Sequence, residues 1–535
     1  MKFQTLTEYP YTAKRRVVMG TRGAVATGQP LAAMAGMEIL LAGGNAVDAA
    51  IAMAITLTVV EPTSNAIGSD AFALVWDGKL HGLNASGKSP KHFPPEIFQG
   101  LPTIPPCDWR SVTVPGAVSG WRSLSERWGK LSFGQLFTPA IRYAECGYPV
   151  SPQVSLAWKK SEEKYLPLTG KEFIPFKEIF FPNNRAPKAS EIWSSQTIAN
   201  TLKEIAETGG ESFYQGKLAE KIANFAANTG GFITLEDLAN HQPLWVNPIS
   251  TNYRGLTVWE MPPNTQGIAA LIALNILSGF DMAAYPRESV ESYHLQIESM
   301  KLAFADLHRY IADEDFLEIS PQNLLSLEYA NQRRALINQQ AQKLVNPGLP
   351  KDGTVYLAAC DGDLMVSLIQ SNFSGFGSGI VPEGTGIALQ NRASGFTLEK
   401  GHPNQVAPNK RPFHTIIPGF LTQDNQPLGP FGVMGADMQA QGHVQVVVNM
   451  ADYLMNPQTA LDAPRWRYLF DNTVKLEPQL DSVVSQEILQ GLIQRGHDAS
   501  LDNQTFFGRG QIICKQEDVL IAASESRTDG LAIAW

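Results

Sequence analysis

The sequence predicts an α+β fold, because helical patterns dominate its first two thirds and strand-like patterns dominate the rest. Residues 30–42 and 46–60 are apolar stretches of helical length, and Gly43-Gly44-Asn45 between them suits a helix end followed by a helix start. Residues 289–311 carry apolar side chains at approximately helical spacing. With 535 residues, of which 44% are hydrophobic, the chain is long enough to bury a large core.

The remaining elements follow from turn residues and from alternation. Residues 71–83 alternate well enough to form a hairpin with Asp77-Gly78 at its turn. Residues 110–240 contain short helical patterns that proline-rich stretches interrupt. Residues 354–370 predict two strands joined by Asp361-Gly362-Asp363. Further strands are expected at 380–390, 413–421 and 428–434, and a helix at 438–455, before an α/β tail that ends at Trp535.

The charge balance is acidic, with 51 Asp and Glu against 42 Lys and Arg, and no basic run is present. A nucleic-acid partner is therefore not expected. The nine histidines form no ligand pattern, and nothing in the sequence implies a metal or a cofactor. The four cysteines are widely spaced, which argues against a disulfide framework and fits a reducing compartment. They are Cys107, Cys146, Cys360 and Cys514.

Two features bear on location. The first twenty residues contain no apolar core of the kind that a secretion signal needs. The apolar stretch 46–60 is interrupted by Asp48 and ended by Glu61-Pro62, so it is too short to span a bilayer and predicts a buried helix. We therefore expect a cytoplasmic protein without a membrane partner.

The pair Gly353-Thr354 combines a possible cut site with a possible nucleophile. A threonine hydroxyl is a weak nucleophile, and an N-terminal threonine can use its own α-amino group as the base. An internal threonine becomes an N-terminus only if the chain is cut before it. Gly353 suits such a cut because it has no Cβ, and residues 347–353 (PGLPKDG) predict a loop. Gly-Thr pairs are common, however, and the pair alone also fits a turn that leads into a strand.

Blocks spread along the whole chain are more specific than this pair. In order they are 40–62, TVPGAVSGW at 113–121, LEDLANH at 235–241, 248–263, ESMKLAFAD at 298–306, GFGSGIVPEGTGIALQN at 375–391, PNKRP at 408–412, GVMG at 432–435 and SESRTDG at 524–530. Together they resemble the γ-glutamyltranspeptidase family of N-terminal-nucleophile hydrolases. The resemblance implies an αββα four-layer sandwich, built jointly by residues 1–353 and 354–535 as one interwoven domain after self-cleavage.

The family chemistry then implies two uses of Thr354. Its Oγ first attacks the Gly353 carbonyl, which leaves the two fragments as a heterodimer. The new N-terminal threonine then attacks a small amide, forms an acyl-enzyme, and passes the acyl group to water or an amine acceptor. The nominal substrates are glutathione-like γ-glutamyl amides.

Four other residues match the family's catalytic positions. Gln370 and Asn372 align with a Thr and an Asn that hydrogen-bond the mature threonine, and residues two apart on a strand share a face. Ordinary strand-edge polarity is the alternative explanation for both, and the family context favours the catalytic one. Gly435 and Ala436 align with the Gly-Gly pair whose N–H groups form the oxyanion hole. The chain departs from the family at Val355, where a second threonine is usual.

The substrate-binding positions depart further. Ser86 stands where the family has the arginine that binds the substrate α-carboxylate, and Gly395 stands where it has the aspartate that binds the α-amino group. Arg392 is a new cation, which could bind a carboxylate or form a surface salt bridge. His414 and Thr415 align with a Ser-Ser pair at the carboxylate, although His414 could simply fill space.

Three alternatives to γ-glutamyl transfer stay open. The altered pocket favours an amidohydrolase of a small carboxylate amide such as oxamate. A catalytically inactive relative could serve as a binding protein, against which the presence of Thr354, Asn372 and Gly435 argues. Nucleotide binding by the glycine loop 375–379 is disfavoured, because the loop lacks G-x-G-x-x-G and Pro382 lies where a helix would start.

Overall fold

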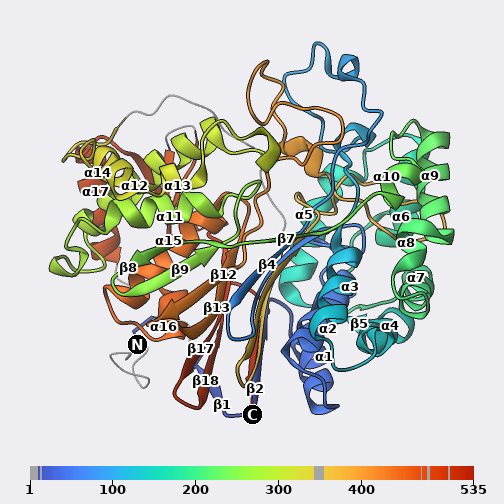
Figure 1. Ribbon diagram of the computed structural model, residues 1–535, viewed down its shortest axis with the longest axis horizontal. Coiled ribbons are helices and arrows are strands. Elements are labelled where there is room, and N and C mark those ends of the chain that lie inside the picture. The colour runs from blue at the N-terminus through green and yellow to red at the C-terminus, as the bar shows by residue number, and fades with distance from the viewer. Residues whose placement is uncertain (1–9, 12–14, 343–354, 471–472, 479–481, 504–505) are drawn as a thin grey trace.

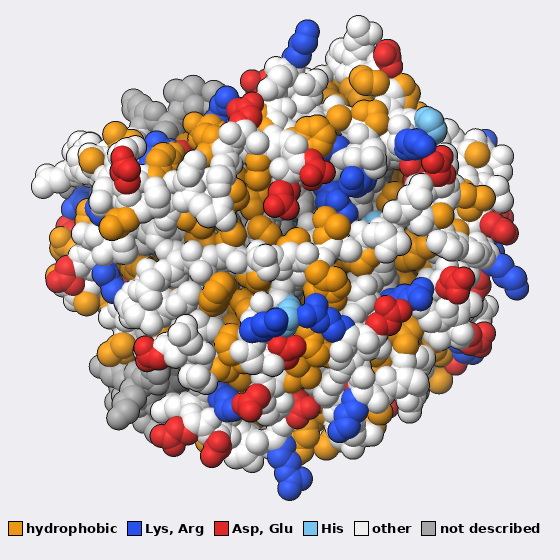
Figure 2. Space-filling view, in the orientation of Figure 1, with side chains coloured by type: hydrophobic (Ala, Val, Ile, Leu, Met, Phe, Trp, Pro, Cys, Tyr) orange, Lys and Arg blue, Asp and Glu red, His pale blue; other side chains and the backbone are white. Residues whose placement is uncertain are grey.

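The computed structural model describes residues 10–11, 15–342, 355–470, 473–478, 482–503 and 506–535. Two β-sheets lie face to face in the middle of the molecule, and a layer of helices covers the outer face of each (Figure 1). The α+β prediction and the four-layer sandwich are therefore confirmed. On the face drawn in Figure 2, acidic and basic side chains are mixed rather than gathered into one basic patch.

Each large sheet has seven strands. The first sheet runs in the order β1 (Val18–Gly20), β18 (Val519–Ser524), β17 (Arg509–Gln516), β13 (Gln426–Met434), β12 (Gly419–Gln423), β9 (Leu256–Glu260) and β8 (Ile249–Tyr253). The second runs β19 (Leu531–Ala534), β2 (Gly23–Thr27), β10 (Val355–Asp361), β11 (Leu364–Ser371), β3 (Asp70–Trp76), β4 (Leu80–Ala85) and β7 (Leu244–Val246). Strands β10 and β11 thus lie between strands from the first part of the chain.

Strand β10 shows how the layers share side chains. Tyr356 and Ala358 point between the two sheets, whereas Val355 and Leu357 join the core under the helices. Successive side chains of a strand point to opposite faces, so a strand buried on both faces must be apolar throughout. This explains why 355–360 is an unbroken run of buried residues rather than an alternating one.

Helices α1 (Pro30–Leu41) and α2 (Ala46–Val60) cover the second sheet. Every residue of α2 is buried, and Asn45 and Asp48 form a capping box at its start. On the first sheet lie α11 (Gly267–Leu277), α12 (Val290–Tyr310) and α15 (Met438–Ala451) (Figure 1).

The other elements surround these layers. The helices are α3 (Ala117–Trp128), α4 (Thr138–Cys146), α5 (Pro152–Tyr165), α6 (Ile174–Phe180), α7 (Gln196–Glu207), α8 (Glu211–Gln215), α9 (Lys217–Thr229), α10 (Leu235–Ala239), α13 (Pro321–Leu324), α14 (Leu327–Arg334), α16 (Pro457–Asp462) and α17 (Ser482–Gln494). The minor strands are β5 (Tyr148–Pro149), β6 (Ile192–Trp193), β14 (Trp466–Tyr468), β15 (Thr473–Leu476) and β16 (Asp498–Leu501).

Most predicted elements are confirmed, including both N-terminal helices, the hairpin at 71–83 and the strand pair after residue 354. The strand expected at 380–390 is wrong, since this segment is a loop in which Gly384 and Gly386 both have φ of +67°. The strand at 413–421 begins only at Gly419. The helix at 438–455 ends at Ala451, and Leu454 has a positive φ that no helix accommodates.

All four cysteines are free, as their spacing predicts. Among the described residues, none of the helices has the length and apolar character that crossing a membrane requires.

Candidate active site

The predicted nucleophile Thr354 and its neighbour Gly353 lie outside the described residues. The first residue after them, Val355, starts β10 and lies directly opposite Gln370 of β11. Successive Cα atoms are about 3.8 Å apart, so the chain holds Thr354 within one such step of Val355. The start of β10 and the end of β11 are therefore the described part of the molecule that adjoins the predicted nucleophile along the chain.

Asn372 follows the last residue of β11 and is completely buried. Its side-chain oxygen accepts a hydrogen bond of 2.8 Å from the Ser69 hydroxyl, which fixes the orientation of the amide. Its Nδ2 has no partner among the described residues, although a buried N–H group normally has one. Asn372 thus offers an oriented, unused donor close to the start of β10.

Gln370 is equally buried but fully occupied. Its Oε1 accepts a bond from Trp121 Nε1 at 2.9 Å, and its Nε2 donates to Asn65 Oδ1 at 2.7 Å. Both partners belong to the helical side of the sheet. These bonds favour a role for Gln370 in holding β11 against the helices over the direct nucleophile contact that the alignment implies.

Gly435 and Ala436 form the turn between β13 and α15. Their φ angles are +141° and +52°, and the second is costly for a residue with a Cβ. Gln266 Nε2 donates to the Ala436 carbonyl at 2.6 Å and to the Thr415 carbonyl at 2.5 Å. The backbone N–H groups of Gly435 and Ala436 themselves have no acceptor among the described residues. Two adjacent free N–H groups at a helix start suit a developing oxyanion.

Arg392 lies in the 3-10 turn Arg392–Gly395 and is 0% exposed, so the surface salt bridge considered for it is wrong. Its Nη1 donates to Thr415 Oγ1 at 2.9 Å, and its Nη2 lies 3.4 Å from Ser371 Oγ. The guanidinium stacks 4.3 Å from the centroid of the Phe373 ring, and its Nε has no partner among the described residues. Burial lowers the pKa of Arg392 because nothing nearby fully compensates the lost hydration.

Asp70 is the carboxyl whose charge acts on Arg392, but the two form no salt bridge. Its Oδ1 accepts N–H bonds from Gly87 and Gly116, and its Oδ2 lies 3.1 Å from His414 Nε2. Burial raises the pKa of Asp70 to about 7, so near neutral pH it is an incomplete counterion for Arg392. Burial also holds the pKa of His414 well below its usual value. The neutral ring therefore hydrogen-bonds Asp70 and is not expected to bind a substrate.

The two positions that lack the family's ionic groups have physical explanations. Ser86 is buried, and its hydroxyl donates to Asn84 Oδ1 at 2.7 Å. A second cation, Arg411, already donates from Nε to the Ser86 carbonyl at 3.1 Å. At Gly395, a Cβ would lie 2.7 Å from the Phe413 carbonyl oxygen, closer than real Cβ atoms approach. An aspartate does not fit there unless the 413 backbone moves.

Gln266, Gly395 and Thr415 are among the walls of a small cavity of about 10 Å³, roughly the space of one water molecule. Its walls also include Phe373, and both Phe373 and Thr415 contact the Arg392 guanidinium. Asp437 is also in the wall, but it is paired with Arg467 at 2.7 Å. The sequence analysis missed Gln266, Ser69 and the Asp437–Arg467 pair, because their contacts join segments that no local pattern connects.

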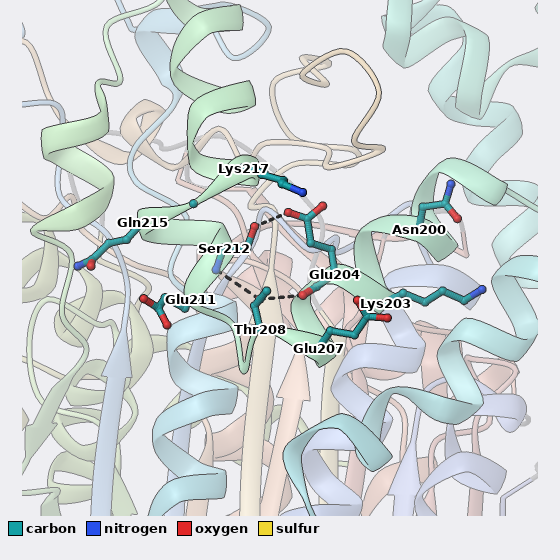
Figure 3. A pocket seen from close by; sticks show the side chains of 10 residues that line it. Asn200, Lys203, Glu204, Glu207, Thr208, Glu211, Ser212, Gln215 and Lys217 are labelled. Carbon is teal, nitrogen blue, oxygen red and sulfur yellow. Dashed lines mark hydrogen bonds between the residues drawn. The ribbon is translucent and has the colours of Figure 1, made fainter.

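A larger cavity of about 790 Å³ lies elsewhere, between α7, α8 and the start of α9 (Figure 3). Glu204, Glu207 and Glu211 line it, and Ser212 donates to the Glu204 carboxylate. The side chains drawn there form hydrogen bonds with one another or point outward. None of them belongs to the predicted active site. This cavity is a surface hollow between helices.

His294, Glu298 and His497 lie close enough together to resemble a metal site. Their hydrogen bonds are already assigned, however. Lys301 Nζ lies 2.8 Å from Glu298 Oε1 and 3.3 Å from His497 Nδ1, His497 Nε2 lies 2.8 Å from His294 Nδ1, and His294 Nε2 donates to the Asn338 carbonyl. The lysine ammonium supplies the positive charge that a metal would bring. We interpret the cluster as a buried structural network.

Comparison with known proteins shows which family the chain is similar to. The family model described as gamma-glutamyltranspeptidase matches residues 32–535. The chain is 34% identical over 529 residues to the glutathione hydrolase-like YwrD proenzyme of Bacillus subtilis (96% of this chain, 99% of that protein). It is 30% identical to the oxamate amidohydrolase proenzyme of Klebsiella pneumoniae (97% and 99%).

Among solved structures it resembles a cephalosporin acylase from Bacillus halodurans, with 50% identity, a TM-score of 0.93 and 99% of each chain covered. A second neighbour is the gamma-glutamyltranspeptidase of Pseudomonas nitroreducens, with 28% identity, a TM-score of 0.54, and coverage of 59% of this chain and 94% of that one. This chain therefore belongs to the gamma-glutamyltranspeptidase family of hydrolases and transferases.

Proposed function

We propose that this protein is a self-processed N-terminal-threonine amidohydrolase whose preferred substrates carry a carboxylate on the acyl half and no free α-ammonium group. The observation that carries the proposal is the buried Arg392 guanidinium, which has unused donors and no salt bridge among the described residues. A buried cation without a bonded anion is costly, and a substrate carboxylate would remove that cost.

The proposed reaction uses Thr354 as nucleophile. Its α-amino group takes the hydroxyl proton while Oγ attacks the amide carbon, and the N–H groups of Gly435 and Ala436 bind the oxyanion. The C–N bond then breaks, and the amine leaves with a proton. Water hydrolyses the resulting ester, so the products are one acid and one amine. In this proposal Asn372 Nδ2 donates to the threonine, and Gln370 holds β11 in place.

The missing ammonium clamp supports the choice of substrate. Gly395 stands where an aspartate would bind an α-amino group, and the Phe413 carbonyl leaves no room for a larger side chain. Asp437 is committed to Arg467. Among the described residues at these positions, a substrate would therefore meet the Arg392 cation and no unpaired anion, which favours small acid amides over γ-glutamyl compounds.

Hydrolysis or transfer of the γ-glutamyl group of glutathione-like amides is the second candidate. The names of two relatives, a glutathione hydrolase-like proenzyme and a glutathione hydrolase proenzyme of Bacillus subtilis, favour it. The word proenzyme in these names also supports cleavage of this chain into the fragments 1–353 and 354–535, which together would form the interwoven heterodimer.

Intact-mass measurement of the purified protein tests the chemistry. We expect two fragments split between 353 and 354, whereas Thr354→Ala should give one uncut, folded, inactive chain. Thr354→Ser keeps a hydroxyl and should still be processed, more slowly. If Thr354→Ala is cut at the same bond, an external protease is responsible and self-processing is wrong.

A further inference from the structure

Glu61 is a buried carboxyl group that has no role in the reaction proposed above. It caps the end of α2, is 2% exposed, and its Oε2 has no hydrogen-bond partner among the described residues. Burial raises the pKa of Glu61 to about 7, and the charge of Arg509 and a hydrogen bond with Ser64 oppose this rise only in part. Buried polar atoms normally have a partner, so the free oxygen indicates a group that is still to be bound.

The backbone around Glu61 is tied to the strand pair that adjoins the predicted nucleophile. Asn65 Nδ2 donates to the Glu61 carbonyl at 3.0 Å. Asn65 Oδ1 accepts from Gln370 Nε2 at 2.7 Å, and Gln370 lies opposite Val355, the first residue of β10. Two hydrogen bonds therefore connect Glu61 to the start of β10 and the end of β11.

The end of strand β2 places the free oxygen more closely. Thr27, the last residue of β2, lies opposite Leu357 and donates from Oγ1 to the Tyr356 carbonyl at 3.3 Å. The next residue is Gly28, and a Cβ there would lie 3.5 Å from Glu61 Oε2. Glu61 Oε2 therefore lies at the end of β2, beside the first residues of β10.

Arg509 approaches Glu61 from the other sheet. It is the first residue of β17 and lies opposite Met434, which precedes the proposed oxyanion turn. Its Nη1 is 3.7 Å from Glu61 Oε1, and its Nε has no partner among the described residues. The Tyr356 ring packs on Gly432 of β13, where a Cβ would lie 2.6 Å from the ring. The Glu61–Arg509 pair thus joins the start of β10 to the end of β13.

This ion pair is incomplete. Its closest approach of 3.7 Å compares with 2.7 Å for the Asp437–Arg467 pair, and it leaves one acceptor and one donor unused. Asp529 adds a second negative charge that acts on Glu61. Two carboxyl groups thus face one guanidinium, and the free atom of Glu61 is an acceptor. Such surroundings suit a group with N–H donors and a positive charge, which is an ammonium.

We propose that Glu61 binds the α-amino group that cleavage before Thr354 creates, accepting its N–H at Oε2, and that Arg509 keeps the carboxyl charged. This inference rests on the proposed function, in which that amino group is the base. During attack on the amide, the amino group takes the hydroxyl proton and becomes an ammonium, which the Glu61 carboxylate stabilises. The proton then passes to the leaving nitrogen as the C–N bond breaks, so Glu61 itself gains and loses no proton.

Glu61→Gln tests the proposal, because it removes the charge and keeps the shape of the side chain. A carboxylate beside an amine favours the ammonium form, so the pKa of the α-amino group should fall by about one unit in this variant. Reductive methylation of the fragment that begins at residue 354, followed by mass spectrometry as a function of pH, measures this pKa without a substrate. The acid limb of the kcat profile should move to lower pH with it, and kcat should fall about tenfold with little change in KM.

The other titratable groups around Glu61 stay in place in this variant. They are Arg509, Asp529 and Tyr148, and burial raises the pKa of Tyr148 so that it remains neutral. The matched control is Asp452→Asn at the far end of α15. The Asp452 side chain is 3% exposed and fully bonded, and this variant should shift neither the α-amino pKa nor the kcat profile.

A cross-linking experiment on the native protein does not depend on how the variants fold. A carbodiimide that activates Glu61 should form an amide with an amino group in contact with it. This bond would rejoin the fragments 1–353 and 354–535 with the loss of one water, and peptide mass spectrometry would locate it between Glu61 and residue 354. Glu61→Gln cannot form it, whereas Asp452→Asn should form it as the native protein does.

The outcomes separate this inference from the proposed function. Cleavage comes before the amine exists, so Glu61→Gln should still be split between 353 and 354. A split native protein that gives no Glu61 cross-link, or an unchanged α-amino pKa in Glu61→Gln, would refute the role of Glu61 alone. The cross-link and the pKa shift without turnover of any acid amide would retain that role and refute the proposed substrate. An uncut native chain would overturn both, because no amine would form.

Discussion

Two buried arginines in this protein have opposite surroundings. Arg465 is 1% exposed, and its guanidinium donates to the Glu525 carboxylate at 2.7 Å and to the carbonyls of Leu461 and Phe507. Arg392 is 0% exposed, yet it bonds only hydroxyl groups among the described residues, at 2.9 and 3.4 Å, and its Nε bonds nothing.

We interpret this difference as that between a charge that stabilises the fold and a charge that is proposed to bind a substrate. A buried ion pair with all its hydrogen bonds made is self-contained, and breaking it leaves an uncompensated charge. A buried cation that lacks an anion destabilises the folded state. Such groups occur mainly at functional sites, where a ligand can supply the missing negative charge. The same contrast holds for asparagines, since Asn65 has every side-chain atom bonded whereas Asn372 has an unused donor.

Replacing Arg465 gives the largest expected effect. Arg465→Met leaves Glu525 buried with a reduced set of donors, namely Arg527 and the Gly510 N–H. Breaking a buried pair costs about 3–5 kcal/mol, and we expect the lower end because Arg527 remains. Urea unfolding measures this loss of free energy. A loss below about 1 kcal/mol would show that the pair contributes little, and the contrast with Arg392 would weaken.

Asn372→Ala should lower kcat about 100-fold, by analogy with the removal of one transition-state donor, which costs about 2.7 kcal/mol. The melting temperature should fall less than in Asn65→Ala, because the substitution removes one described side-chain bond, the one that Asn372 Oδ1 accepts from the Ser69 hydroxyl. The matched control, Asn65→Ala, removes bonds to Leu57, Glu61 and Gln370, and it should lower stability more than activity. The reverse pattern would make Asn372 a structural residue.

Arg392→Met should change the free energy of unfolding by less than about 1 kcal/mol, or stabilise the protein. An apolar side chain of similar length removes an unpaired buried charge and can still pack on Phe373. The comparison with Arg465→Met, measured by the same urea titration, uses the same substitution at two buried sites. Destabilisation of both by the same amount would mean that Arg392 is structural.

The smallest expected effect is a pH dependence from Asp70. Burial raises the pKa of this carboxyl to about 7, so it is protonated below pH 7 and becomes an anion above it. The anion competes with a substrate carboxylate for Arg392. We expect KM for an acid amide to rise about threefold from pH 6 to pH 8, equivalent to about 0.6 kcal/mol. In Asp70→Asn this rise should disappear, and a rise that persists would assign it to another group.

Much of the fold could be predicted because its signals are local. The Gly43-Gly44-Asn45 break, the Asp77-Gly78 turn and the Asp361-Gly362-Asp363 turn each lie at a true boundary between elements. The prediction of a strand at 380–390 is wrong. The apolar residues of this segment suggested a strand, but two glycines with positive φ keep it a loop. The prediction of a strand over residues 413–418 is wrong for a related reason. This segment is buried, but it does not pair with a neighbouring strand along its length.

The candidate site was predicted unevenly. Motif resemblance led to Asn372, Gly435 and Ala436; Asn372 lies two residues after Gln370, which pairs with the first residue of β10, and Gly435 and Ala436 follow the end of β13. It could not show that Gln370 is held by Trp121, since that contact joins residues 249 positions apart. Nor could it show the burial of Arg392, because a single arginine in a loop segment is usually exposed.

The acid preference of the enzyme, measured with and without Arg392, tests the central claim most directly. An acid amide and its neutral methyl ester are compared by kcat/KM in the native protein and in Arg392→Met. We predict that the native enzyme prefers the acid by about 10- to 100-fold, as a charged hydrogen bond worth about 1.5–3 kcal/mol implies, and that Arg392→Met loses this preference. An unchanged preference in Arg392→Met, or fast turnover of γ-glutamyl-4-nitroanilide by the native enzyme, would contradict the account.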